Sequence, residues 1–83
     1  MIKIYSRPGC SKCDITKLAL TAAGLPYEER SLLDPAAEAE AMATGFRTLP
    51  IVVDGDVTWC DMRPDLIAEA AARAAEPVPA GAA

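Results

Sequence analysis

The sequence predicts a single small α/β domain in which three helices flank a four-stranded mixed sheet. Three observations lead to this prediction. The period of the apolar residues changes several times along the chain, glycine or proline marks each change, and the resulting order of elements is βαβαββα. A chain of 83 residues accommodates one such domain and not two. The strand–helix–strand beginning requires a right-handed crossover, which makes the first two strands parallel.

The first half of the chain contains a strand, a helix and a second strand. The segment Ile2–Tyr5 is β-branched and aromatic, and the proline and glycine that soon follow end it as a strand. Helical spacing predicts a helix from Ser11 to Ala23, which ends because Gly24 suits a left-handed C-terminal position. Tyr27–Leu33 reads as the second strand. The apolar face predicted for this helix consists of Ile15, Leu18, Ala19 and Ala22.

A second helix and a β-hairpin follow. Asp34 is suited to cap a helix over Ala36–Thr44, with a proline at its first position, and Gly45 ends it. The residues Leu49–Val53 form the third predicted strand, and the Asp-Gly dipeptide after it is a strong hairpin signal. The fourth strand, Val57–Cys60, is therefore expected to be antiparallel to the third.

The last predicted helix begins at Pro64-Asp65, and its apolar residues repeat at helical spacing. Glu69 and Arg73 are expected to form an outward i, i+4 pair on this helix. The domain is predicted to span residues 1–75. Residues 76–83 are rich in Pro, Ala and Gly without periodicity, and we interpret them as a flexible C-terminal tail.

Composition excludes several classes of function. The absence of histidine removes Ser/His/Asp and Cys/His triads and imidazole metal sites. The net charge of −4 argues against a nucleic-acid binder, which normally has a basic domain. Neither an 18-residue apolar run nor a signal-like apolar region occurs, so we expect no membrane insertion and no export. Three cysteines in such a chain indicate a reducing compartment, the cytoplasm, where paired thiols are more often catalytic or metal-binding than structural.

The motif Cys10-Ser11-Lys12-Cys13 lies between the first predicted strand and the first predicted helix. Disulfide exchange requires a thiolate, and the unpaired N–H groups and partial positive charge of a helix N-terminus stabilise one. Arg7 and Lys12 add positive charge near the two thiols. We expect Cys10 to be the exposed nucleophile. Cys13 lies about one turn into the helix, and we expect it to be the shielded thiol that resolves a mixed disulfide.

Two other readings of the cysteines stay open. A CxxC pair can be half of a zinc site or contribute to an iron–sulfur site, but a structural zinc needs four ligands and only Cys60 is left as a third thiol. Cys60 itself is either a small apolar filler or a third redox thiol. By strand alternation it faces away from Trp59, so one of the two is expected to point to a helix-free edge or to solvent.

The strand that ends in CxxC, followed by βα and a proline-initiated strand in a hairpin, resembles the thioredoxin fold in its minimal glutaredoxin-like form. The resemblance covers residues 1 to about 75. It implies that Pro50, in Thr48-Leu49-Pro50, follows a cis peptide bond and lies against the CxxC motif. It also implies that the backbone of Leu49 pairs with an extended substrate segment.

Within this fold the chain resembles the NrdH redoxins, which carry a W-S-G-F-R-P-[D/E] segment where this chain has Trp59-Cys60-Asp61-Met62-Arg63-Pro64-Asp65. The resemblance implies a cofactor-free, monomeric thiol–disulfide oxidoreductase that donates electrons to ribonucleotide reductase and is reduced by thioredoxin reductase. Glutathione-dependent glutaredoxins are the alternative, because Cys60-Asp61 matches the end of their G-G-[C/S]-D-D segment, whose aspartate binds the glutathione amine. Thr58-Trp59 in place of two glycines is expected to fill the glutathione cleft.

The roles of three further residues stay open at this point. Trp59 either contacts substrate or packs on an edge strand. Arg63 either clamps the last loop or is solvated at a helix start. Arg47 either contacts an acidic partner segment or is solvated.

Overall fold

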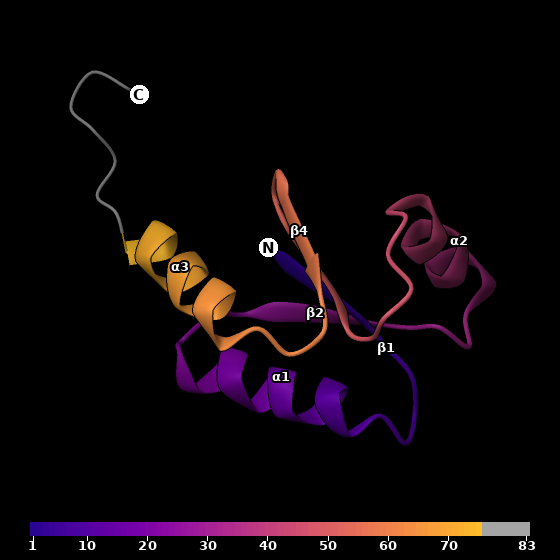
Figure 1. The fold of residues 1–83 in the computed structure, drawn as a ribbon, viewed down its shortest axis with the longest axis horizontal. Coiled ribbons are helices and arrows are strands. Elements are labelled where there is room, and N and C mark those ends of the chain that lie inside the picture. The colour runs from indigo at the N-terminus through magenta and orange to yellow at the C-terminus, as the bar shows by residue number, and fades with distance from the viewer. Residues whose placement is uncertain (76–83) are drawn as a thin grey trace.

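The computed structural model describes residues 1–75, which form a four-stranded sheet and three helices (Figure 1). The predicted order βαβαββα is confirmed, whereas the predicted tail, residues 76–83, lies outside the described residues. No helix within residues 1–75 is long and apolar enough to cross a membrane. The elements are β1 (Ile2–Ser6), α1 (Ser11–Ala22), β2 (Tyr27–Ser31), α2 (Pro35–Ala43), β3 (Ile51–Asp54), β4 (Val57–Cys60) and α3 (Pro64–Ala75).

The sheet has the strand order β2-β1-β3-β4. Strands β1 and β2 are parallel, as the crossover rule predicts, and β3 is antiparallel to both β1 and β4. The hairpin turn contains Gly55 at a φ of 59°, a left-handed conformation that glycine adopts without steric cost. The two edge strands differ: β2 carries three consecutive charged side chains, Glu28, Glu29 and Arg30, and β4 has only four residues.

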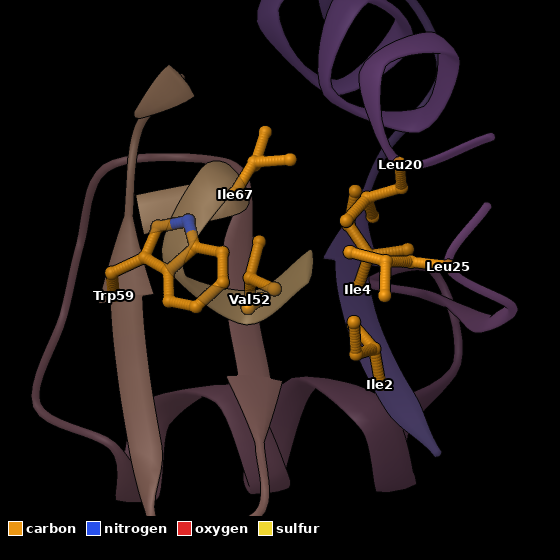
Figure 2. Close-up of a cluster of buried hydrophobic side chains, with 8 residues drawn as sticks. Ile2, Ile4, Leu20, Leu25, Val52, Trp59 and Ile67 are labelled. Carbon is orange, nitrogen blue, oxygen red and sulfur yellow. The ribbon is translucent and has the colours of Figure 1, made fainter. Parts of the chain in front are cut away.

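The helices cover both faces of the sheet. Helices α1 and α3 lie together on one face and α2 lies on the other (Figure 1). The larger core lies between the sheet, α1 and α3. Figure 2 shows the Trp59 ring beside Val52 and Ile67, on the same side of the sheet as the α1 residue Leu20. The buried members of this cluster are Ile2, Ile4, Leu20, Leu25, Val52, Trp59, Ile67 and Ala70.

A smaller core holds α2 against the opposite face. Ala37 and Ala41 of α2 pack on Tyr5 and Ile51, and their short side chains let the helix lie close to the strands. The Tyr5 hydroxyl donates to Glu40 over 2.8 Å, so this layer also has a polar link. Burial, and then the neighbouring Glu40 carboxylate, raise the pKa of Tyr5.

The residues that α1 buries are not those that its apolar pattern predicted. The helix buries Cys13, Thr16 and Leu20, whereas Ile15 and Leu18 are 50% and 71% exposed. The predicted set and the buried set both have helical spacing. The buried set is harder to recognise in the sequence because it contains a threonine and a cysteine. A buried hydroxyl group needs a hydrogen-bond partner. The hydroxyl of Thr16 has one, because it donates to the sulfur of Met62 over 3.4 Å.

Two strand limits differ from the prediction by two residues, and the ends of β1 and β3 differ by one. Strand β2 ends at Ser31 and not at Leu33, because Ser31 starts a turn in which its carbonyl accepts the Asp34 N–H over 3.0 Å. Strand β3 begins at Ile51 and not at Leu49, after a cis Leu49–Pro50 bond. The helix limits agree within one residue, and β4 has its predicted limits.

Arg73 does not form the predicted pair with Glu69. Its guanidinium instead donates to the Asp54 carboxylate at 2.6 Å. The pair joins α3 to the end of β3, so a tertiary contact replaces the local i, i+4 pair.

Candidate functional site

The two cysteines of the CxxC motif lie at the junction between the β1–α1 loop and the first turn of α1. Cys10 is the N-cap of α1, and its sulfur accepts the backbone N–H of Cys13 over 3.1 Å. The two Cα atoms are 5.2 Å apart and the two sulfurs lie within disulfide-bonding distance. Cys13 is fully buried and Cys10 is half-buried, so a partner disulfide can reach Cys10 first.

The helix end is the part of this site that favours a thiolate. The N–H that meets the Cys10 sulfur is one of the orphan donors of α1, and a donor of this kind stabilises negative charge on sulfur. The cations nearby are partly neutralised. Lys12 is ion-paired with Asp61 at 2.9 Å, and Lys17 is ion-paired with Glu29 at 2.7 Å. Hydrogen bonding to Glu29 is the main reason why the pKa of Lys17 is raised.

The segment before β3 has the backbone that the resemblance implied. The Leu49–Pro50 peptide bond is cis, which confirms the prediction, and Pro50 is fully buried. The carbonyl of Pro50 accepts the backbone N–H of Asp61 over 2.9 Å. Because Asp61 also pairs with Lys12, the CxxC helix, the cis-proline segment and the β4–α3 loop meet at one place.

Asp61 has an unusual backbone conformation for a residue with a side chain. Its φ is 71°, in the left-handed region that aspartate and asparagine enter more readily than most residues. One carboxylate oxygen, Oδ1, accepts the backbone N–H of Met62 over 2.7 Å and also faces the ammonium of Lys12. The Lys12 contact, and then the Met62 N–H, lower the pKa of Asp61.

Three other residues named from the sequence, Trp59, Cys60 and Arg63, have their contacts outside the CxxC motif. Trp59 is 3% exposed and lies in the larger core, so its ring packs in the core and does not contact a substrate. Arg63 is exposed and forms a two-point pair with Asp65 at the start of α3. Cys60 packs against the smaller core and is half-buried, because both faces of the sheet are covered and neither of the two neighbours points to a helix-free side.

A shallow groove of about 250 Å³ extends from the Leu49 segment toward α2. Its lining is mainly apolar and contains two cationic residues, Arg7 and Arg47, and one anionic residue, Glu38. Met42 and Phe46 also line it, and they are 71% and 38% exposed. No sequence motif marks Met42, and Phe46 stands out in the sequence only as a bulky residue directly after Gly45. Within residues 1–75, no three Cys, Asp or Glu side chains are grouped to hold a metal ion.

A CxxC pair on a helix N-terminus, beside a cis-proline in a sheet of this topology, defines a thiol–disulfide oxidoreductase with the thioredoxin-like fold. The glutaredoxin family model matches residues 2–58 of the chain. The glutaredoxin-like protein NrdH of Salmonella typhimurium is 42% identical over 67 residues, which are 80% of this chain and 83% of that protein. The chain therefore belongs to the glutaredoxin family, and within it to the glutaredoxin-like NrdH proteins.

Solved structures agree with this assignment. The glutaredoxin-like NrdH-redoxin from Escherichia coli, described as having a thioredoxin-like activity profile, superimposes with a TM-score of 0.76 at 37% identity. The match covers 94% of this chain and 97% of that chain. A glutaredoxin from Archaeoglobus fulgidus superimposes with a TM-score of 0.70 over 82% of each chain, and at 20% identity it supports the fold alone.

Proposed function

We propose that this protein reduces disulfides in partner proteins, with ribonucleotide reductase as the target and thioredoxin reductase as the source of electrons. The supporting observation is the unequal burial of the two thiols, one half-buried at the helix end and one fully buried behind it. The choice of partners rests on the similarity to NrdH proteins. The electrons are carried by the Cys10–Cys13 pair without a further cofactor, in the cytoplasm, where thiols are kept reduced.

The proposed reaction moves two electrons in two exchanges. The Cys10 thiolate attacks one sulfur of the partner disulfide, so that a mixed disulfide forms and the second partner sulfur leaves as a thiolate. Cys13 then loses its proton and attacks the Cys10 sulfur. The mixed disulfide breaks, the first partner sulfur leaves as a thiolate, and the Cys10–Cys13 disulfide remains. The partner gains two thiols after protonation, and two electrons from the reductase restore the pair.

The groove beside Leu49 is the proposed contact for the segment that carries the partner disulfide. An extended segment can pair with the backbone of Leu49 and place an apolar side chain against Phe46. Arg7 and Arg47 favour acidic residues in that segment, because two cationic residues line the groove against one anionic residue, Glu38.

Asp61 supports thioredoxin reductase over glutathione as the reductant. In the glutathione-dependent relatives that the sequence also resembles, the matching aspartate recognises the glutathione amine. Here the Asp61 carboxylate already binds the ammonium of Lys12 at 2.9 Å. The glutathione amine would have to displace Lys12 from this contact before it could bind.

The test is reduction of insulin disulfides with NADPH under two regenerating systems. We expect turnover with thioredoxin reductase and little turnover with glutathione plus glutathione reductase. The reverse pattern would replace the proposal by a glutathione-dependent activity. Cys10→Ser is expected to abolish turnover, whereas Cys13→Ser is expected to accumulate a mixed disulfide that mass spectrometry detects. Equal activity of the two variants would contradict the roles given to the thiols.

A further inference from the structure

The ion pair between Lys12 and Asp61 joins two segments that are far apart in sequence and meet at the redox site. Lys12 lies between the two cysteines in the first turn of α1, and Asp61 follows β4. The Lys12 ammonium is the only side-chain cation inside the CxxC motif. In the structure it is turned to the Asp61 carboxylate, which is 2.9 Å away.

The β4–α3 loop holds the Asp61 carboxylate in place. The backbone N–H of Asp61 bonds to Pro50, and its Oδ1 accepts the N–H of Met62 over 2.7 Å. These two bonds fix both the backbone and the side chain of a residue at a φ of 71°. The carboxylate is therefore a fixed negative charge, whereas Lys12 is a flexible side chain that is 56% exposed.

We propose that Asp61 is a positioning residue for disulfide exchange: it holds the Lys12 ammonium and thereby limits the fraction of Cys10 that is present as thiolate. The carboxylate of Asp61 largely cancels the effect of the Lys12 ammonium on the Cys10 sulfur. When the Asp61 carboxylate is removed, the Lys12 side chain is free to turn toward the thiolate. This inference rests on the proposed role of Cys10 as the attacking thiol.

Other charged groups near the CxxC helix also affect the pH at which Cys10 ionises, so they must be the same in all variants that are compared. Asp14 on α1 is paired with Lys17, and Arg63 after β4 is paired with Asp65. None of these groups is altered in the variants below. The charged residues around the redox end are Arg7, Lys12, Asp14, Lys17, Glu29, Arg47, Asp61, Arg63 and Asp65.

The test measures alkylation of Cys10 by iodoacetamide against pH in the fully reduced protein, with fragment-ion masses to locate the label. Asp61→Asn is the variant of choice, because asparagine tolerates the left-handed backbone and its amide oxygen can still accept the Met62 N–H. We expect the midpoint of the alkylation profile to fall by about half a pH unit, which is about a threefold gain in rate at about pH 6. In a Lys12→Gln background, Asp61→Asn is expected to cause a clearly smaller shift.

Two results would overturn the inference: no shift with Asp61→Asn, or the same shift with and without Lys12, which would mean that Asp61 does not act through it. A measurement on the unaltered protein keeps the inference testable if a variant does not fold. The carboxyl carbon resonance of Asp61 should move at the pH where Cys10 titrates, and an unchanged resonance would count against the coupling. Labelling of Cys13 before Cys10 would instead contradict the proposed thiol roles, so the two failures are distinguishable.

Discussion

Replacement of Trp59 by phenylalanine and, separately, by alanine tests whether this residue belongs to the core or to a substrate cleft. The ring is 3% exposed, and its Nε1 has no hydrogen-bond partner among the described residues 1–75. Phenylalanine leaves a cavity on the order of 40 Å³, which costs about 1 kcal/mol at about 24 cal/mol per Å³. It also removes a buried N–H that costs about 1–3 kcal/mol when unpaired. These two effects oppose each other.

We therefore expect the free energy of unfolding of Trp59→Phe to equal that of the wild type or exceed it by up to about 2 kcal/mol, and that of Trp59→Ala to fall by about 3–5 kcal/mol. Urea unfolding followed by far-UV circular dichroism measures both free energies. Tryptophan fluorescence does not serve here, because both variants lack the only tryptophan of the chain. The kcat/KM for insulin reduction should not change with Trp59→Phe. A core role for Trp59 would be contradicted by a cost under about 1 kcal/mol for Trp59→Ala, or by a Trp59→Phe variant that keeps its stability and loses most of its activity.

Three further predictions concern stability. Leu20→Ala should cost about 2–5 kcal/mol in urea unfolding, because Leu20 is fully buried, whereas the matched control Leu18→Ala should change little; similar costs would contradict the assigned face of α1. Asp34→Ala should cost about 1 kcal/mol because its carboxylate caps α2, and Asp34→Asn should restore most of it. The Lys17 contact lowers the pKa of Glu29, so this group contributes stability above its unfolded pKa and loses it as pH falls through its lower folded pKa. The stability difference between wild type and Glu29→Gln should therefore shrink below about pH 4.5 in urea titrations, and a constant difference would be inconsistent with the ion pair.

The parts of the molecule that local chemistry determines could be predicted from the sequence. The Asp-Gly turn identified the hairpin, and the CxxC motif before a helical pattern placed the two thiols at the α1 N-terminus. The cis bond before Pro50 followed from the resemblance together with the CxxC motif, because proline alone is usually trans.

The features that depend on tertiary partners could not be predicted in the same way. The buried stripe of α1 contains Thr16, and its burial is understandable only once Met62 supplies a partner for the hydroxyl. The orientation of Trp59 depends on which face of β4 receives α3, and alternation alone does not decide this. The pair between Lys12 and Asp61 joins residues 49 positions apart, and a local pattern holds no information about such a contact.

The composition of the sheet edges affects how this protein behaves toward other copies of itself. An edge strand exposes unpaired backbone groups to which a strand of another molecule can add. Strand β2 opposes such addition because an added strand would lie beside the charged side chains of Glu28, Glu29 and Arg30. Strand β4 has only four residues and is too short to pair with a long strand. Both edges are therefore protected against strand-to-strand aggregation. This protection disfavours pairing between copies of the chain through either edge of the sheet.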